Sequence, residues 1–344
     1  MALLRNFFAL SIMAAALTTA AVAQGDSCKI SELPVGVVNS NGESYIGLNA
    51  SSFSSRAGKT ILPIKSMTYD DGPRRIVLVV DQSKKVNADG RKAQADMLAV
   101  LLGSARAQDS FALITARGPA RVVKFGEERS ALTAAAADDA FGSHGNSKEV
   151  GVMDAILQAV DMFGESKPGD SIIVMAYDLE GNHGANARKV AKALEEHQVR
   201  MFGLAVGPVS IKNISTSGQT TTPYGLATAT PATGDLVFYT GDDNFYPLTR
   251  NSGGLVSAVL NYDVKTNFSM KNPAIQARVK QQAHVVFNMI STYYRLGIEP
   301  VSLGRSEDLT VEANDSLRKS VPHMFMLYPH QIGACPPAVS ATAK

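Results

Sequence analysis

The segment IVLVVDQSKKV, Ile76–Val86, joins a continuous apolar run to an acidic residue. Ile76–Val80 are all apolar, and Asp81 follows them directly. A run of this kind is typical of a strand that is buried on both faces of a parallel sheet. Ligands of such sheets bind at the carboxyl ends of the strands, so Asp81 is the first candidate for a functional residue.

Strand and helix patterns alternate along the chain beyond this segment. The strand patterns are Ser110–Thr115, Arg121–Phe125, Ser171–Ala176 and Val199–Val206. The helical patterns are Ala88–Arg106, Ala131–Ala137, Val150–Phe163, Ala185–His197, Gly254–Tyr262 and Ala274–Tyr294. We expect Ser215–Thr233, which is rich in Ser, Thr, Gly and Pro, to be a long solvated loop. The alternation predicts an α/β fold with a doubly wound, mostly parallel sheet.

Both ends of the chain carry short strand patterns instead. Val35–Val38 precedes Asn39–Gly42, whose Asn-Gly pair is a strong indication of a hairpin. The C-terminal strand patterns are Tyr294–Ile298, Leu309–Ala313 and Met324–Tyr328. We therefore predict a small accessory β module from the two chain ends, in which residues 24–72 pair with residues 266–336. Residues 73–265 would form the α/β domain, and residues 337–344 a tail.

The first residues have the pattern of an export signal. Arg5 precedes an apolar run, Phe7–Ala16, and Ala21-Val22-Ala23 supplies the small residues that a signal peptidase needs. A transmembrane anchor is the alternative, but the run is short and polar residues follow it. We predict a signal peptide over residues 1–23, cleaved near Ala23. The protein would be exported, either periplasmic or secreted, with no membrane span in the mature chain.

The chain has 2 cysteines, Cys28 and Cys335, near the two ends of the mature sequence. In an oxidising compartment an even pair favours a disulfide, which would hold the two ends side by side. Two unpaired thiols are the alternative.

Charge and motif content narrow the function. The 33 basic and 31 acidic residues leave a net charge of +2, too small a field to indicate a nucleic-acid partner. The sequence has no Gly-x-Ser-x-Gly elbow, no phosphate-binding loop and no dinucleotide-binding fingerprint. We therefore expect neither nucleic-acid binding nor an enzyme.

Two acids stand at strand ends, Asp81 after the first strand and Asp178 after the fourth, in SIIVMAYDLEGN. This layout is that of a von Willebrand factor A domain. The chain resembles the VWFA-related family of exported bacterial proteins, described mainly from acidobacteria, over about residues 33–330. The segments that carry the resemblance are VVNSNGESYIGLNASSF, IVLVVDQS, GVMDAILQAV, SIIVMAYD, SGG and YYRLGIEP.

The A-domain family has a metal-ion-dependent adhesion site, formed by Asp-x-Ser-x-Ser, a Thr and a second Asp. Asp81, Ser83 and Asp178 match three of these positions and would be the ligands if Mg²⁺ or Mn²⁺ binds. Lys85 stands at the position of the second Ser, and Val150 at that of the Thr. Neither side chain offers an oxygen, and a protonated lysine repels a cation. The resemblance therefore implies a degenerate metal site.

Three interpretations of Asp81 remain open. In the first, Lys85 or Lys84 has taken the place of the cation and pairs with both strand-end acids. In the second, Asp81 and Ser83 cap the following turn or helix. In the third, Ser147 replaces the lost Thr and a metal still binds.

The resemblance implies an exported, non-enzymatic protein-interaction module that needs no cofactor and has a protein partner. Binding would use the loops Asp81–Ala88, Ser143–Lys148 and Asp178–Asn186, with residues 215–233 as a second surface. A metal-dependent adhesion domain that binds a partner carboxylate is the main alternative. A structural envelope protein and an enzyme are the others.

Overall fold

The computed structural model describes residues 30–39, 41–118, 120–137, 150–177, 185–206, 214–216, 237–239, 245–258, 268–301, 306–321 and 324–332. Over these residues the chain forms one eight-stranded sheet and two four-stranded sheets. The predicted signal peptide, both cysteines and the predicted tail lie outside the described part of the chain.

The eight-stranded sheet has the order β10-β11-β12-β9-β8-β5-β6-β7. Its strands are β5 (Arg75–Asp81), β6 (Ser110–Ala116), β7 (Val122–Val123), β8 (Ser171–Ala176), β9 (Arg200–Ala205), β10 (Ile214–Thr216), β11 (Val237–Tyr239) and β12 (Val256–Ala258). The pairs from β12 through β9, β8 and β5 to β6 are parallel, and the outer pairs are antiparallel. The order of the parallel strands reverses at β5, which confirms the predicted doubly wound sheet of the von Willebrand factor A type.

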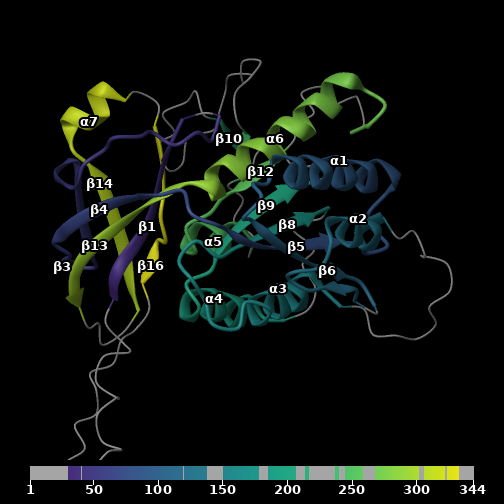
Figure 1. Ribbon diagram of the computed structural model, residues 1–344, viewed down its shortest axis with the longest axis horizontal. Coiled ribbons are helices and arrows are strands. Elements are labelled where there is room, and N and C mark those ends of the chain that lie inside the picture. Colours follow the sequence, from purple (N-terminus) through teal and green to yellow (C-terminus); the bar gives the residue numbers. More distant parts are fainter. Residues whose placement is uncertain are drawn as a thin grey trace, which may run out of the picture.

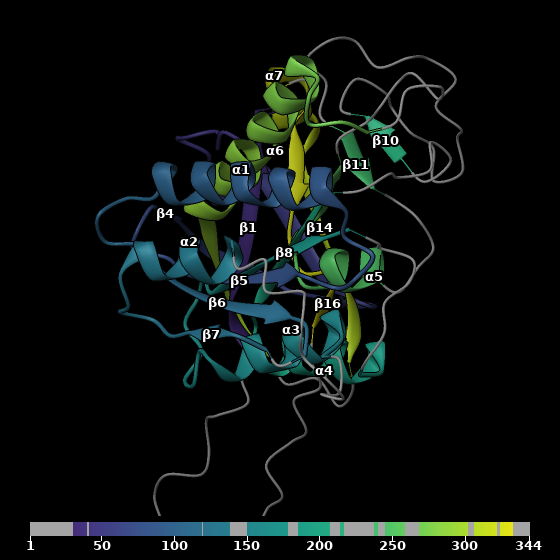
Figure 2. The same ribbon diagram turned by 90° about the vertical axis from the view of Figure 1, so that its right-hand side faces the viewer.

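Helices cover both faces of this sheet (Figures 1 and 2). They are α1 (Ala88–Ser104), α2 (Arg129–Ala137), α3 (Val152–Asp161), α4 (Ala187–Glu196), α5 (Phe245–Asn251) and α6 (Pro273–Ser291). Alternate residues of β5 face opposite sides, as the pleat requires. Ile76, Leu78 and Val80 pack in one core with α1, α2 and α6. Val77 and Val79 pack in the other with α3, α4 and α5, which explains the unbroken apolar run.

Strands from the two chain ends form the accessory β module, which lies beside the α/β domain (Figure 1). One sheet has the order β15-β1-β13-β4 and the other β16-β14-β2-β3. The strands are β1 (Ile30–Val38), β2 (Phe53–Ala57), β3 (Thr60–Ile61), β4 (Ile64–Asp70), β13 (Tyr293–Val301), β14 (Glu307–Ala313), β15 (Phe325–Leu327) and β16 (Gln331–Ile332). Short helices η1 (Ala50–Ser52) and α7 (Asp315–Ser320) join them. The predicted module from the two chain ends is therefore confirmed.

Tyr293 and Tyr294, the first two residues of β13, point toward opposite parts of the molecule. Tyr294 belongs to the core of the β module, and its hydroxyl donates to the carbonyl of Tyr45 at 2.7 Å. Tyr293, one residue earlier, points the other way, and the guanidinium of Arg74 lies 4.5 Å from its ring centroid. Arg74 immediately precedes β5, so the alternation along β13 joins the two parts of the fold.

The helix predicted over Gly254–Tyr262 is wrong. Val256–Ala258 form β12, the outermost of the parallel strands, and residues 259–262 lie outside the described part. All three residues of β12 are buried, and a short apolar run gives no period that separates a buried strand from a helix. Helix α5 was not predicted, because Phe245–Asn251 has too few residues to show a period.

Two further local predictions need correction. Ser215 and Thr216 belong to β10, whereas the sequence predicts a loop from Ser215 to Thr233; residues 217–233 are outside the described part. The Asn-Gly turn forms, with the amide of Asn39 donating to the carbonyl of Glu43 at 2.9 Å. It is followed by a single bridge, Val38 to Ser44, rather than by a second hairpin strand. The Asn-Gly pair favours a reversal of the chain, but it does not make the residues after the turn form a strand.

Gly254 is expected to be the glycine least tolerant of change. A Cβ there would lie 1.9 Å from the carbonyl oxygen of Met201, which belongs to the backbone of β9 and cannot rotate away. We expect Gly254→Ala to lower the free energy of unfolding by about 3 kcal/mol, measured by urea denaturation. Gly103→Ala is the control, because a Cβ at this position in α1 meets nothing within 4 Å. Equal effects of the two changes would contradict the packing argument.

Candidate functional site

Asp81 lies at the carboxyl end of β5, where the sheet order reverses, and is only 3 % exposed. Its Oδ1 accepts the amide N–H of Ser83 at 3.0 Å. Its Oδ2 accepts the amide N–H of Tyr177, just beyond the end of β8, at 3.1 Å. The carboxylate therefore ties together the loops that follow two neighbouring strands.

The side-chain amide of Gln94, from helix α1, also binds the carboxyl ends of β5 and β8. Its Nε2 donates to the carbonyl of Asp81 at 2.7 Å and to that of Met175 at 3.1 Å. Gln94 is buried, so these two bonds satisfy both of its donors without water. Gln94 was not predicted as a site residue, although the sequence places this one amide at helical spacing from Met97 and Leu101, on an apolar face.

The loop after β5 is fixed by its own residues. Asn87 caps α1, because its Oδ1 accepts the amide of Gly90 at 2.8 Å, and its Nδ2 donates to the hydroxyl of Tyr177 at 3.0 Å. The ring of Tyr177 lies against Gly90, where a Cβ would meet it at 2.8 Å. Val86 is buried beneath the turn. This loop is consequently a preformed part of the strand-end edge.

The other predicted site positions differ in their surroundings. Ser83 is half-buried, whereas Lys84 and Lys85 are both exposed. Val150 is half-buried and precedes Gly151, the N-cap of α3. Asp178, and with it Ser147, lies outside the described residues, so the complete set of predicted ligands is not brought together here.

The contacts of Asp81 with the described residues agree with the capping interpretation, since the two hydrogen bonds found there come from backbone N–H groups. Each carboxylate oxygen can accept more than one hydrogen bond, so a lone pair remains on each. In the part of the chain that the structure describes, no three His, Cys, Asp or Glu side chains gather as a metal site. The assignment of Asp81, Ser83 and Asp178 as ligands therefore stays a prediction.

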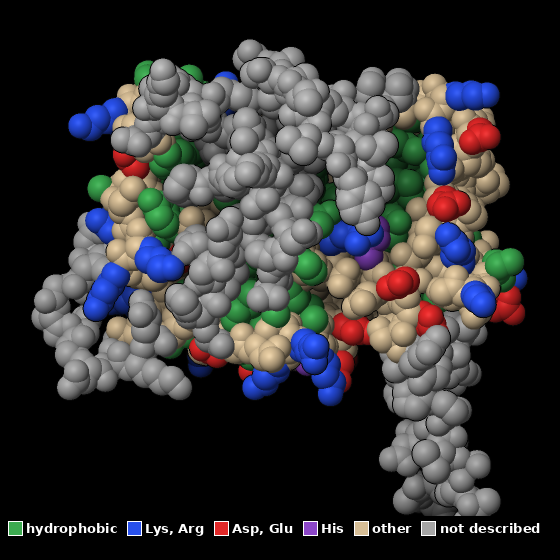
Figure 3. Space-filling model, turned by 180° about the vertical axis from the view of Figure 1, so that it is seen from behind, with side chains coloured by type: hydrophobic (Ala, Val, Ile, Leu, Met, Phe, Trp, Pro, Cys, Tyr) green, Lys and Arg blue, Asp and Glu red, His purple; other side chains and the backbone are tan. Residues whose placement is uncertain are grey.

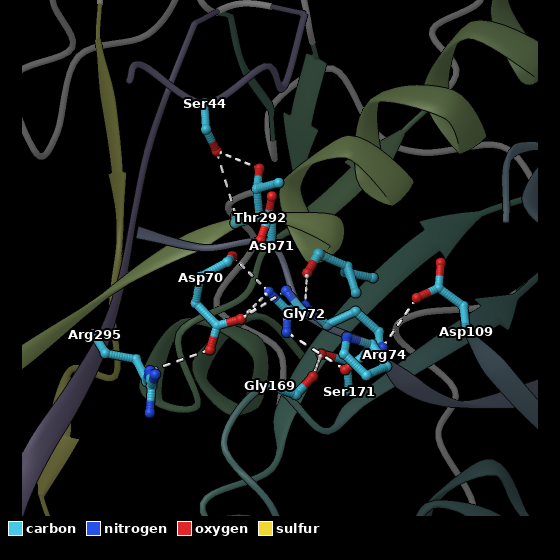
Figure 4. A network of polar contacts seen from close by, with 12 residues as sticks. Ser44, Asp70, Asp71, Gly72, Arg74, Asp109, Gly169, Ser171, Thr292 and Arg295 are labelled. Atoms are coloured by element: carbon cyan, nitrogen blue, oxygen red, sulfur yellow. Dashed lines mark hydrogen bonds and ion pairs between the residues drawn. The ribbon is translucent and has the colours of Figure 1, made fainter. Parts of the chain in front are cut away.

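The opposite edge of the sheet, where the parallel strands begin, carries a polar network that joins the α/β domain to the β module (Figure 4). Arg74, whose side chain is 2 % exposed, lies at its centre. Its Nε donates to the carbonyl of Ile290 at 3.2 Å, and its Nη2 to the carbonyl of Asp70 at 2.6 Å. One guanidinium thus binds both segments through which the chain passes between the two parts.

Asp70 balances two arginines in this network. Its Oδ1 lies 3.0 Å from Nη2 of Arg74, and its Oδ2 lies 3.1 Å from Nε of Arg295 on β13. Burial by itself raises the pKa of Asp70. The N–H of Gly72 and the positive charges of Arg74 and Arg295 outweigh burial, so the pKa is lowered overall and the carboxylate stays ionised.

Two more ion pairs complete the edge. Asp109 accepts from the guanidinium of Arg106 at 2.8 Å and from the amide of Arg74 at 3.0 Å. Arg106 also donates to the carbonyl of Gly72 at 2.7 Å. We call Asp70, Arg74, Arg106, Asp109 and Arg295 the junction network. Farther along the edge, Arg75 binds Asp170 through two donors.

The surface shows no preference for one sign of charge on the face in Figure 3, where described Lys and Arg side chains are interspersed with Asp and Glu. This distribution agrees with the small net charge, and the described side chains form no basic groove on this face. No helix in the described ranges has the length and apolar character needed to cross a bilayer.

No family model and no curated protein matches the sequence. The solved structures that match this chain include three bacterial proteins of low sequence identity. A von Willebrand factor type A protein from Catenulispora acidiphila is 10% identical over 91% of this chain and 75% of its own, with a TM-score of 0.40. An aerotolerance-related membrane protein from Bacteroides fragilis is 13% identical over 61% and 98%, with a TM-score of 0.39.

The third is the conserved hypothetical protein BatB from Bacteroides thetaiotaomicron, 15% identical over 60% of this chain and 96% of its own, with a TM-score of 0.37. All three TM-scores are below 0.5. Scores this low do not identify a fold by themselves. The von Willebrand factor A-like fold is identified instead by the strand order, the parallel pairing and the helices on both faces of the sheet.

Proposed function

We propose that this chain is an exported, non-enzymatic protein-interaction module of the von Willebrand factor A type. The partner, a protein, would bind at the carboxyl edge of the sheet. The observation that supports this proposal most directly is the state of Asp81, whose carboxylate holds two loop backbones in place at that edge. A fixed loop loses little entropy on binding and therefore favours a specific contact.

In this proposal the edge works without metal or cofactor. Lys85 and Val150 occupy positions where the related adhesion site has oxygen ligands. The exposed Lys84 would instead present positive charge to an acidic patch of the partner. Export to the periplasm or beyond follows from the predicted signal peptide and belongs to the same proposal.

The partner surface can be tested by charge reversal. We expect Lys84→Glu to abolish co-purification of the partner that the unaltered protein captures from cells that produce it. Lys319→Glu, an exposed lysine on α7 of the β module, is the matched control and should leave capture unchanged. Equal capture by all three proteins would place the contact away from the strand-end edge.

The metal-dependent alternative is separated by thermal unfolding. A ligand that binds only the folded state raises the midpoint as its concentration passes the dissociation constant. We expect the same midpoint in EDTA and after titration of Mg²⁺ or Mn²⁺. A metal-dependent rise that disappears in Asp81→Ala would favour the adhesion site, with Asp81 among its ligands.

A further inference from the structure

Arg200, the first residue of β9, is a buried cation at the edge that the β module covers. It is 2 % exposed, and it lies between the rings of Phe202 and Tyr293, whose centroids are 4.9 and 5.5 Å from its Cζ. Burial lowers the pKa of the guanidinium to about 10, so Arg200 remains charged at neutral pH. A charge in this position needs a compensating group.

The hydrogen bonds of Arg200 leave most of its donors unused. Its Nε donates to the carbonyl of Gly253 at 3.3 Å. Nη1 and Nη2 are buried and have no hydrogen-bond partner among the described residues. The hydroxyl of Tyr293 is likewise buried without a partner there. Burial first, and then the neighbouring carboxylate of Asp70, raise the pKa of Tyr293 to about 12, so this hydroxyl keeps its proton and can donate.

The acids along this edge are already occupied. Asp170, whose carbonyl accepts the amide of Arg200, uses its carboxylate for Arg75 and for the amide of Lys167. Asp109 is bound by Arg106 and Arg74, and Asp70 by two arginines of the junction network. The charged side chain that acts on the pKa of Arg200 is Arg74, which is also positive and lowers it. None of these three carboxylates is bonded to Arg200, so its charge has no paired acid among the described residues.

We propose that Arg200 and Tyr293 bind a small monovalent anion of the chloride class between the α/β domain and the β module. The unused donors are the N–H groups of a guanidinium and a phenol O–H, which a halide accepts without needing a defined geometry. Burial on all sides excludes a large anion. The bound ion would supply the negative charge that the nearby carboxylates, already paired, do not.

The role of the ion would be to lock the two parts together. Arg200 belongs to the central sheet and Tyr293 to the β module, and the ring of Tyr293 also contacts Arg74. An anion between them would bridge the parts beside the junction network. Loss of the ion would leave two like charges near one ring, which weakens the same contact.

The test is thermal unfolding in sodium chloride against sodium gluconate, at constant ionic strength. Gluconate is too large for a buried site, so it serves as the anion that does not bind. We expect chloride at ten times its dissociation constant to raise the midpoint by about 3 °C, with saturation. Bromide should act similarly and give an anomalous diffraction peak beside Arg200 in crystals.

Two variants make the outcome decisive. Arg200→Met should remain folded, because an apolar residue of similar volume can replace a buried charge, and it should lose the chloride-dependent shift. Tyr293→Phe should keep the shift but need several-fold more chloride. Arg188→Met, an exposed arginine of α4, is the matched control and should keep the full response.

The proposal is overturned if Arg200→Met responds to chloride as the unaltered protein does, since the effect would then be general salt stabilisation. It is also overturned if crystals grown in bromide show water alone at Arg200.

Discussion

Replacing Arg74 with methionine is expected to lower the free energy of unfolding by about 3–5 kcal/mol, because the change removes the buried one of the two arginines that balance the part-buried carboxylate of Asp70. The guanidinium binds Asp70 and the carbonyl of Ile290, so its loss also leaves buried acceptors unpaired. Chemical denaturation measures the effect. Lys65→Met is the control, because the Lys65–Glu299 pair of the β module is exposed and should contribute less than about 1 kcal/mol. Similar losses in both variants would mean that burial does not strengthen the junction.

The same pairing has a signature at low pH. The pKa values of Asp70 and Asp109 are both lower than is usual for an aspartate. Burial raises each of them, but hydrogen bonds and arginine charge outweigh it. A carboxyl group with a depressed folded pKa stabilises the protein above its unfolded pKa, near 4. That stabilisation is lost as pH falls through the lower, folded pKa. Stability of the Arg74→Met variant should therefore change less between pH 5 and pH 2 than that of the unaltered protein, as the midpoint of urea unfolding would show.

Asp81→Ala is expected to destabilise by about 2–4 kcal/mol, because two backbone N–H groups at strand ends lose their acceptor. The affected donors are the amides of Ser83 and Tyr177. Urea denaturation in EDTA isolates this structural effect from any contribution of metal. Asp161→Ala, at an exposed position at the end of α3, should change stability by less than about 0.5 kcal/mol.

Asp81→Asn refines the result. It keeps one oxygen acceptor but turns a donor toward the second N–H, so an intermediate loss is expected. A loss in Asp81→Ala no larger than that of Asp161→Ala would mean that water replaces the carboxylate at both amides. Asp81 would then not contribute measurably to the stability of the fold.

The fold could be predicted where burial leaves a pattern in the sequence. Ile76–Val80 and Ser171–Ala176 are apolar at every or nearly every position, because helices cover both sides of their strands. The short strand Val256–Ala258 has the same environment but too few residues to reveal it. The β module could be predicted from strand patterns at both ends, although nothing in the sequence specified which strands pair.

The sites were harder to predict, for two physical reasons. The partners of Asp81 are backbone amides, and every residue has one, so sequence alone cannot identify them. The junction network consists of charged residues that are distant in sequence, and charged residues are usually exposed. Arg74 and Arg200 did carry an indication, since Arg200 directly precedes an apolar strand segment and only Arg75 separates Arg74 from another. A cation in that position is either at the surface or paired, and only the fold distinguishes the two.

The pairing of β1 with β13 has a consequence for how the protein is made. Leu33 on β1 pairs with Leu296 on β13, so β1 is synthesised long before its partner strand. Until then its backbone groups are an open template for other chains. A chain that stops after Ser291 would contain the strands of the central sheet but leave β1 and β4 without their common neighbour. The β module can therefore close only after nearly the entire chain has been synthesised. An incomplete product would expose strand edges of the kind that quality-control proteases and chaperones recognise.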